Sequence, residues 1–215
     1  MATVTIYADT TARGTVYSDG GTKTADYATV RTGDVLNVTG VCSSGQWFQT
    51  PTHPHFRIFE GFVAFDTSTT NIPAAAVLDS ATLYAQFYID VSTTNFILEA
   101  RLGSFLPNAP TTTDWVPGDN LSGLTKLATF NTVDIVDLNT YYALTSEAAL
   151  LTNINRSGYT QVLYCSAETT DNSEPGGKEY VFQDAGMGVG VDPKLVIEYH
   201  LPATGFVVIN TSSVA

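Results

Sequence analysis

The stretch SATLYAQFYID, residues 80–90, carries the clearest structural signal in the sequence. Because successive side chains of a β-strand point to opposite faces, apolar residues at every second position predict a strand with one face in a core. Here those residues are Leu83, Ala85, Phe87 and Ile89. Similar alternation predicts strands at residues 96–102, 161–166 and 195–199, and further strands are expected at 35–41, 46–50 and 56–65.

Residues 62–65, Phe-Val-Ala-Phe, predict a strand in the centre of the fold. Both of its faces are apolar, as in a strand that is covered on both sides. Clusters of Gly, Pro, Ser and Asp between the strands predict turns, and one of these is Ser-Ser-Gly at residues 43–45.

One segment, residues 145–152, predicts a short helix. Thr145 or Ser146 is expected to cap it, and Glu147 would lie favourably in its first turn. Many short strands with one short helix predict an all-β fold, a β-sandwich. We expect a single domain over residues 1–201, followed by a C-terminal extension at 202–215 that forms an extra strand or an arm.

Composition excludes several classes of function. Of the 215 residues, 14% are charged and the net charge is −12, which argues against binding to nucleic acid or to anionic lipid. No apolar run is long enough to span a membrane. Threonine supplies about one residue in seven, and together with the aromatic residues it favours strands.

The N-terminal residues alternate like a strand and predict no secretory signal, so we expect a full-length chain made in a cytoplasm. Cys42 and Cys165 lie far apart and lack the spacing of a zinc site. A disulfide across two sheets and two free thiols both remain open, since a cytosol is reducing.

Four motifs occur in an order that carries a resemblance. FVAFDTS at residues 62–68, IP at 72–73 and LDSATLY at 78–84 are followed by DPKLVIEY at 192–199. This order resembles the DNRLRE domains, which are jelly-roll β-sandwiches classed among carbohydrate-binding modules. Over residues 2–201 the resemblance implies a jelly-roll fold and a glycan-binding role. The sequence departs from that family in one respect, since the Trp that often ends its short helix is missing.

Sugars stack on exposed aromatic rings that have polar neighbours. The aromatic residues in loop-like contexts are the candidates for such a site, although each also fits a core or edge position: Trp47, Trp115, Tyr141 and Tyr142.

Oxygen-rich loops are candidates for calcium, which takes six to eight oxygen ligands. The first such loop carries Asp114, Asp119 and Asn120, and the second is residues 171–174 with Glu179. Solvated loop acids are the alternative in both cases, so we predict no cofactor and regard Ca²⁺ only as a weak option. His53 and His55 form a histidine pair without a third ligand, and His200 is expected to be structural.

No residues stand out as catalytic. Glycosidase chemistry needs two carboxylates across a cleft, and nothing singles out such a pair among 21 acids. The Gly-rich stretch at residues 186–190 lacks the lysine and helix of a phosphate loop. We therefore expect a protein that is not an enzyme.

Three functional hypotheses follow. The first is a bacteriophage virion structural protein, either a minor tail protein or a capsid decoration protein. It would form a symmetric homo-oligomer, with a trimer preferred, and bind other virion subunits and host surface glycan. Its docking candidates are Phe206, Val207, Val208 and Ile209, in an arm that could add to a neighbouring sheet. The second hypothesis is a free carbohydrate-binding module, and the third, least favoured, is an enzyme.

Overall fold

Antiparallel strands make up most of the structure, a computed structural model that describes residues 1–20, 26–48, 55–105, 109–183 and 192–202. The predicted all-β sandwich is confirmed. The predicted arm, Phe206 to Ile209, lies outside the described residues, as does His53. No described helix is long and apolar enough to cross a membrane.

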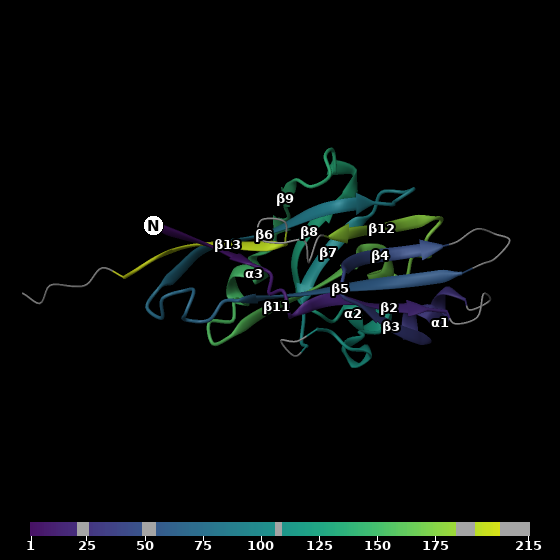
Figure 1. Ribbon diagram of the computed structural model, residues 1–215, viewed down its shortest axis with the longest axis horizontal. Helices are drawn as coiled ribbons and strands as arrows, with labels where there is room; N and C mark the ends of the chain where they lie inside the picture. The colour runs from purple at the N-terminus through teal and green to yellow at the C-terminus, as the bar shows by residue number, and fades with distance from the viewer. Residues whose placement is uncertain (21–25, 49–54, 106–108, 184–191, 203–215) are drawn as a thin grey trace, which may run out of the picture.

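Sheet A is the first layer of the sandwich. It contains β1 (Ala2–Tyr7), β13 (Lys194–His200), the first part of β6 (Val77–Asp90) and β9 (Tyr141–Ala143). The predicted strands at 80–90 and 195–199 are thus confirmed. The first strand and the last described strand lie side by side, as the purple and yellow ribbons in Figure 1 show, and Ala2 pairs with Tyr199.

Sheet B is the second layer, and it joins sheet A through β6. After β6 its order is β12, β4, β5, β11, β7, β8 and β10, while β2 pairs with the other edge of β5, and β3 with β2. The bounds of these strands are β2 (Arg13–Asp19), β3 (Val35–Thr39), β4 (Cys42–Phe48), β5 (Phe56–Asp66), β7 (Ile97–Leu102), β8 (Lys126–Asn131), β10 (Thr145–Ser146), β11 (Tyr159–Ser166) and β12 (Lys178–Gln183).

The main core lies between the two sheets. Val63 and Phe65 of β5 pack there with Leu83 and Phe87 of β6. Ile72, in the link of turns after β5, is fully buried in the same core. The carboxylate of Asp66 accepts a hydrogen bond from the backbone N–H of Ser68 at 3.1 Å, which forms the turn that ends β5.

A second core covers the outer face of sheet B. Phe62 and Ala64 of β5 pack there beneath α1 (Tyr27–Thr32) and α2 (Gly118–Leu121), next to α4 (Ala167–Thr170). Residues 62–65 are at most 1% exposed, which confirms the prediction of a strand buried on both faces. Cys42 lies in the main core and Cys165 in the second, and both thiols are free, so no disulfide forms.

Three details of the prediction are wrong. Residues 43–45 are not a turn but continue β4, because their backbone groups pair with β12. The helix near residue 148 is α3 (Ala148–Thr152), and Glu147 rather than Thr145 or Ser146 is its N-cap residue, since those two form β10. The described residues contain α1, α2 and α4 as well, together with the 3₁₀ turns η1 (Thr112–Asp114) and η2 (Thr132–Asp134), instead of one short helix.

Candidate functional site

One face of sheet B carries an aromatic row that crosses neighbouring strands. Tyr17 of β2 lies opposite Phe59 of β5, Phe59 lies opposite Gly45 of β4, and Gly45 lies opposite Tyr180 of β12. Directly opposed residues of a ladder point to the same face. The sheet therefore brings together three rings that lie far apart in the sequence.

A charged row lies beside the aromatic row, two residues further along each strand. It contains Asp19 of β2, Arg57 of β5, Trp47 of β4 and Lys178 of β12, again in register. We call these two rows, together with Phe182 of β12 and Tyr88 of β6, the aromatic face.

The rings of the aromatic face form a continuous chain of contacts. Phe59 stacks on Tyr180, with ring centroids 4.9 Å apart and planes 24° from parallel. Phe59 also contacts Tyr17 at 5.7 Å, and Tyr180 contacts Trp47 at 6.2 Å and Phe182 at 5.5 Å. Phe182 in turn contacts Tyr88 at 5.8 Å, so the chain reaches β6. Five adjacent strands at ~4.8 Å spacing make this surface about 19 Å wide.

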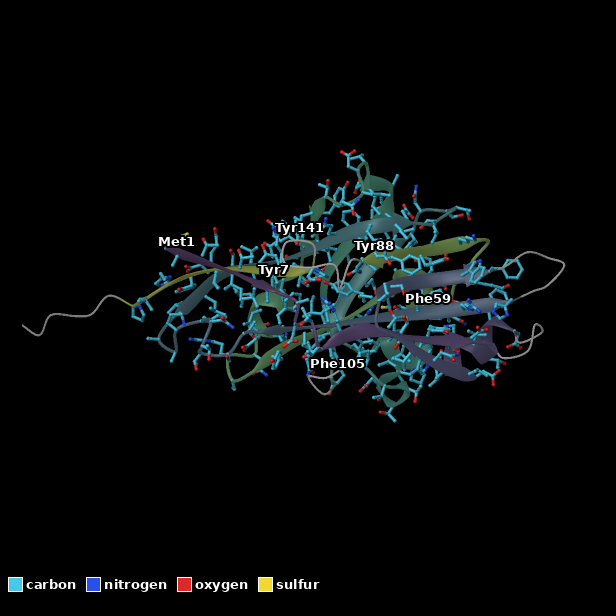
Figure 2. The ribbon with its side chains drawn as sticks, viewed as in Figure 1. Met1, Tyr7, Phe59, Tyr88, Phe105 and Tyr141 are labelled. Carbon is cyan, nitrogen blue, oxygen red and sulfur yellow. The ribbon has the colours of Figure 1, made fainter. Side chains whose placement is uncertain are left out.

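Side chains on this surface are accessible. Phe59 is buried by its neighbours, but the other five rings keep intermediate exposure. Figure 2 shows Phe59 and Tyr88 toward the end of the molecule formed by β4 and β12, and Met1 toward the opposite end. Phe105 packs on Phe62 in the second core, which covers the other face of β5.

Gly45 lies between Phe59 and Tyr180 in the aromatic row, and its lack of a side chain lets the two rings stack. Its φ is +129°, a conformation that side chains disfavour. A Cβ at this position would lie 2.1 Å from the carbonyl oxygen of Glu179 and 2.6 Å from the Cα of Tyr180. The missing side chain therefore lets the backbone of β12, with Tyr180, lie this close to β4.

In the second row Asp19 and Arg57 form an ion pair, and Arg57 and Lys178 also contact the rings. Asp19 binds Arg57 through an ion pair of 2.6 Å and lies 2.7 Å from the His55 ring nitrogen Nε2. The Arg57 guanidinium lies 5.1 Å from the centre of the Trp47 ring, and Lys178 Nζ lies 5.7 Å from it. Trp47 is thus flanked by two cations, which favours a fixed ring position.

A buried polar network supports the strands from the opposite side. Gln46, next to Trp47 in β4, accepts hydrogen bonds from the hydroxyls of Tyr27 in α1 and Thr169 in α4. Its amide nitrogen donates to Glu179 at 2.8 Å and to the carbonyl of Ser173 at 3.0 Å. These bonds tie β4 and β12 to the covering helices, so the aromatic face is built on strands that are held in place.

Of the aromatic residues predicted to bind glycan, the structure places Trp47 on this face. Trp115 is only 9% exposed and belongs to the second core, so it is corrected to a core residue. Tyr142 packs on Phe130, and its hydroxyl holds the loop at residues 136–137. Tyr141 lies under Lys194, with Nζ 3.9 Å from its ring centre, and donates a hydrogen bond to a backbone carbonyl.

The residues predicted to bind calcium have other partners. Asp114 accepts hydrogen bonds from the backbone and the hydroxyl of Thr111 at 2.8 and 3.0 Å, and Asp119 forms a 2.7 Å ion pair with Arg31. Asn120 is exposed. Within the described ranges no three His, Cys, Asp or Glu side chains group in a way that could hold a metal ion. His200 forms an ion pair with Asp79 at 2.8 Å, which fits a structural role.

The sequence reasoning missed most of the aromatic face. In β12, Tyr180 and Phe182 alternate with buried residues, which is a period-two signal; β5 gives no such signal, because Phe59 and the residues on both sides of it are all buried. That signal shows which residues share a face within each strand, but not which strands are neighbours.

A scan of the chain against protein-family models finds no match, and neither does a search of curated proteins. The resemblance to DNRLRE domains therefore stays a prediction that rests on the motifs quoted above.

Proposed function

We propose that this protein binds carbohydrate without catalysis, through the aromatic face. The observation that carries this proposal is the pair of adjacent rows on one sheet, aromatic in one row and charged in the next. A sugar ring has the matching surfaces, because its C–H groups pack on aromatic rings while its hydroxyls exchange hydrogen bonds with polar groups.

The polar groups beside the rings include both donors and acceptors. Arg57 and Lys178 supply N–H donors, Asp19 supplies carboxylate oxygens, and the Tyr180 hydroxyl can act in both ways. A width of about 19 Å suits an oligosaccharide that crosses several strands rather than a single sugar.

Charge favours a neutral glycan. The protein carries a net charge of −12, which repels polyanions over a distance set by the ionic strength. The guanidinium of Arg57 is already paired with Asp19. The ligand class that we propose is therefore a neutral, hydroxyl-rich polysaccharide.

Affinity electrophoresis tests this proposal. The protein runs through native gels that contain a soluble neutral polysaccharide, such as hydroxyethyl cellulose, xylan or glucomannan, and parallel gels contain alginate or hyaluronan. We expect at least one neutral polymer to retard the wild type. Retardation by the acidic polymers alone contradicts the choice of ligand, and mobility unchanged by every polymer contradicts the proposal.

Tyr180→Ala is the variant that locates the site. Removing ~50–100 Å² of apolar contact at about 25 cal/mol/Å² costs about 1–2.5 kcal/mol, a loss of affinity of about tenfold. Tyr84→Ala is the matched control, because Tyr84 is also a partly exposed tyrosine in a strand but lies in sheet A. Equal losses in both variants would place the ligand elsewhere.

We further propose that the protein works as a structural subunit of a bacteriophage particle, as a minor tail protein or, alternatively, a capsid decoration protein. An ordered apolar loop favours this second candidate function: Val133, Val136 and Leu138 are 54%, 80% and 46% exposed. The Tyr142 hydroxyl fixes this loop through three hydrogen bonds to residues 136 and 137. A fixed apolar surface on a chain with only 14% charged residues suits docking to other subunits.

Proteomics of purified particles tests the virion proposal. We expect the protein to copurify with particles at a fixed ratio to the capsid protein, and its gene to lie beside capsid, tail-tube or tape-measure genes. A protein found free in host cytoplasm and absent from washed particles would refute the virion role, while the carbohydrate proposal would stand.

A further inference from the structure

The outer edge of β1 is an unprotected edge of sheet A. β1 pairs with β13 on one side, and no strand of the described residues pairs with its other side. Figure 1 shows β1 at the end of the molecule that carries the N-terminus. An open edge presents a row of unpaired backbone N–H and C=O groups to any strand that can add to it.

The sequence of β1 has none of the features that usually block such pairing. Residues 2–7, Ala-Thr-Val-Thr-Ile-Tyr, contain no charge, proline or glycine, and the pairing with β13 is free of register shifts. Natural edge strands are protected by lysines, prolines, bulges or very short length. The other terminal strands of the described residues differ in this respect: β9 has three residues, β10 has two, and η1 lies against β3.

The side chains of β1 are complementary to a second copy of themselves. Val4 and Ile6 lie on the core side, where Ile6 is 7% exposed, whereas Thr3, Thr5 and Tyr7 are exposed on the other side. In an antiparallel pair of β1 strands related by a twofold axis through the sheet, opposed residues come from the same face. A register centred on Val4 or on Thr5 therefore places apolar residues opposite apolar residues, and hydroxyl-bearing residues opposite one another.

We propose that β1 is a self-association edge, and that two copies of this chain pair antiparallel through β1 to form one continuous sheet from both copies of sheet A. Cross-strand threonine pairs and extended backbone ladders stabilise such a contact, and no charge of β1 has to be desolvated. The interface is isologous, so it closes as a dimer. The interface contains none of the strands that carry the aromatic face, so the proposal stands or falls independently of carbohydrate binding.

Sedimentation velocity of the full chain over micromolar concentrations tests the proposal. We expect the wild type to associate reversibly from 23.0 kDa to twice that mass. The variant Thr3→Lys/Thr5→Lys places like charges against each other across the interface and should weaken dimerisation about tenfold or more. The control Thr140→Lys/Thr152→Lys adds the same charge at two exposed positions elsewhere and should dimerise like the wild type.

A cross-linking experiment covers the case in which the lysine variant folds poorly. Thr3→Cys/Thr5→Cys should form a covalent dimer on mild oxidation in either register, while the wild type should not, since Cys42 and Cys165 are both buried. A wild type that stays monomeric overturns the proposal. A dimer that neither responds to the lysines nor cross-links through the cysteines overturns it as well.

Discussion

Replacing Gly45 by alanine tests whether the aromatic face depends on the absence of one side chain. The added Cβ would lie 2.1 Å from the Glu179 carbonyl oxygen and 2.6 Å from the Tyr180 Cα, closer than any ordinary contact. Both are backbone atoms of β12, which is bonded to β4 on one side and to β6 on the other. The clash can be relieved only by moving β12 away from β4.

Two effects should lower the free energy of unfolding of Gly45→Ala. A φ of +129° strains an alanine by about 1–2 kcal/mol, and the overpacking against β12 adds about 1–3 kcal/mol. We therefore expect Gly45→Ala to lower the free energy of unfolding by about 2–5 kcal/mol. Tyr180 moves with β12, so carbohydrate retardation should weaken as well.

Urea unfolding, followed by tryptophan fluorescence and circular dichroism, measures the first effect as a shift in midpoint at constant slope. Gly40→Ala is the control, since no atom outside its chain neighbours lies within 4 Å of its Cβ, and it should change stability by about 0.5 kcal/mol or less. A Gly45→Ala protein as stable as this control would refute the reasoning, because it would mean that β4 and β12 can separate at little cost.

Three further predictions concern polar groups, two of them buried carboxyls. Burial raises the pKa of Glu60 well above its usual range, so stability falls as pH rises from about 4.5 toward the folded-state pKa, by at most ~1.4 kcal/mol per pH unit; Glu60→Gln should remove this slope in urea melts at several pH values. The pKa of Glu99 is shifted in the opposite direction: burial alone would raise it, but hydrogen bonds from Lys126 and Arg101 lower it. Glu99→Gln should therefore lower the free energy of unfolding by about 3 kcal/mol at neutral pH, and by progressively less as pH falls below 4.5. A Glu99→Gln defect that persists unchanged in acid would contradict this. Tyr142→Phe should cost about 1–2 kcal/mol and speed hydrogen exchange at residues 136 and 137, whose amides donate to the hydroxyl; unchanged exchange there would mean that the loop is held by other contacts.

The sequence predicted those parts of the fold that depend on local periodicity. Residues 80–90 and 62–65 are strands with the expected faces, because alternation within one strand reports burial directly. The turn predicted at residues 43–45 is wrong. Ser-Ser-Gly is a typical turn sequence, but here these residues pair with β12, and the close approach of Tyr180 requires the glycine. Alternation at residues 96–102 predicts a strand with one buried face, yet α4 covers the other face as well, and Glu99 there is 3% exposed.

The candidate site depends on which strands are neighbours in the sheet. Trp47 was found as a lone aromatic residue, but its neighbours in the aromatic face come from β2, β5, β6 and β12. Their proximity is set by strand order, and strand order follows from long-range pairing that no local pattern encodes. Trp115 was a candidate for an exposed glycan-binding ring because it lies in a loop with polar neighbours. In the structure α1 and its C-cap residue Gly33 cover its ring.

The shared strand β6 has a mechanical consequence. Its first half pairs with β13, which pairs with β1, and its last residues pair with β12 at the aromatic face. In Figure 1 these two regions lie toward opposite ends of the long axis. A tensile load between an anchor at the β1 end and a ligand on the aromatic face would therefore pass along β6 and shear its ladders. Under shear the hydrogen bonds between two strands share the load and break together, whereas pulling a strand away from the edge of a sheet breaks them one at a time.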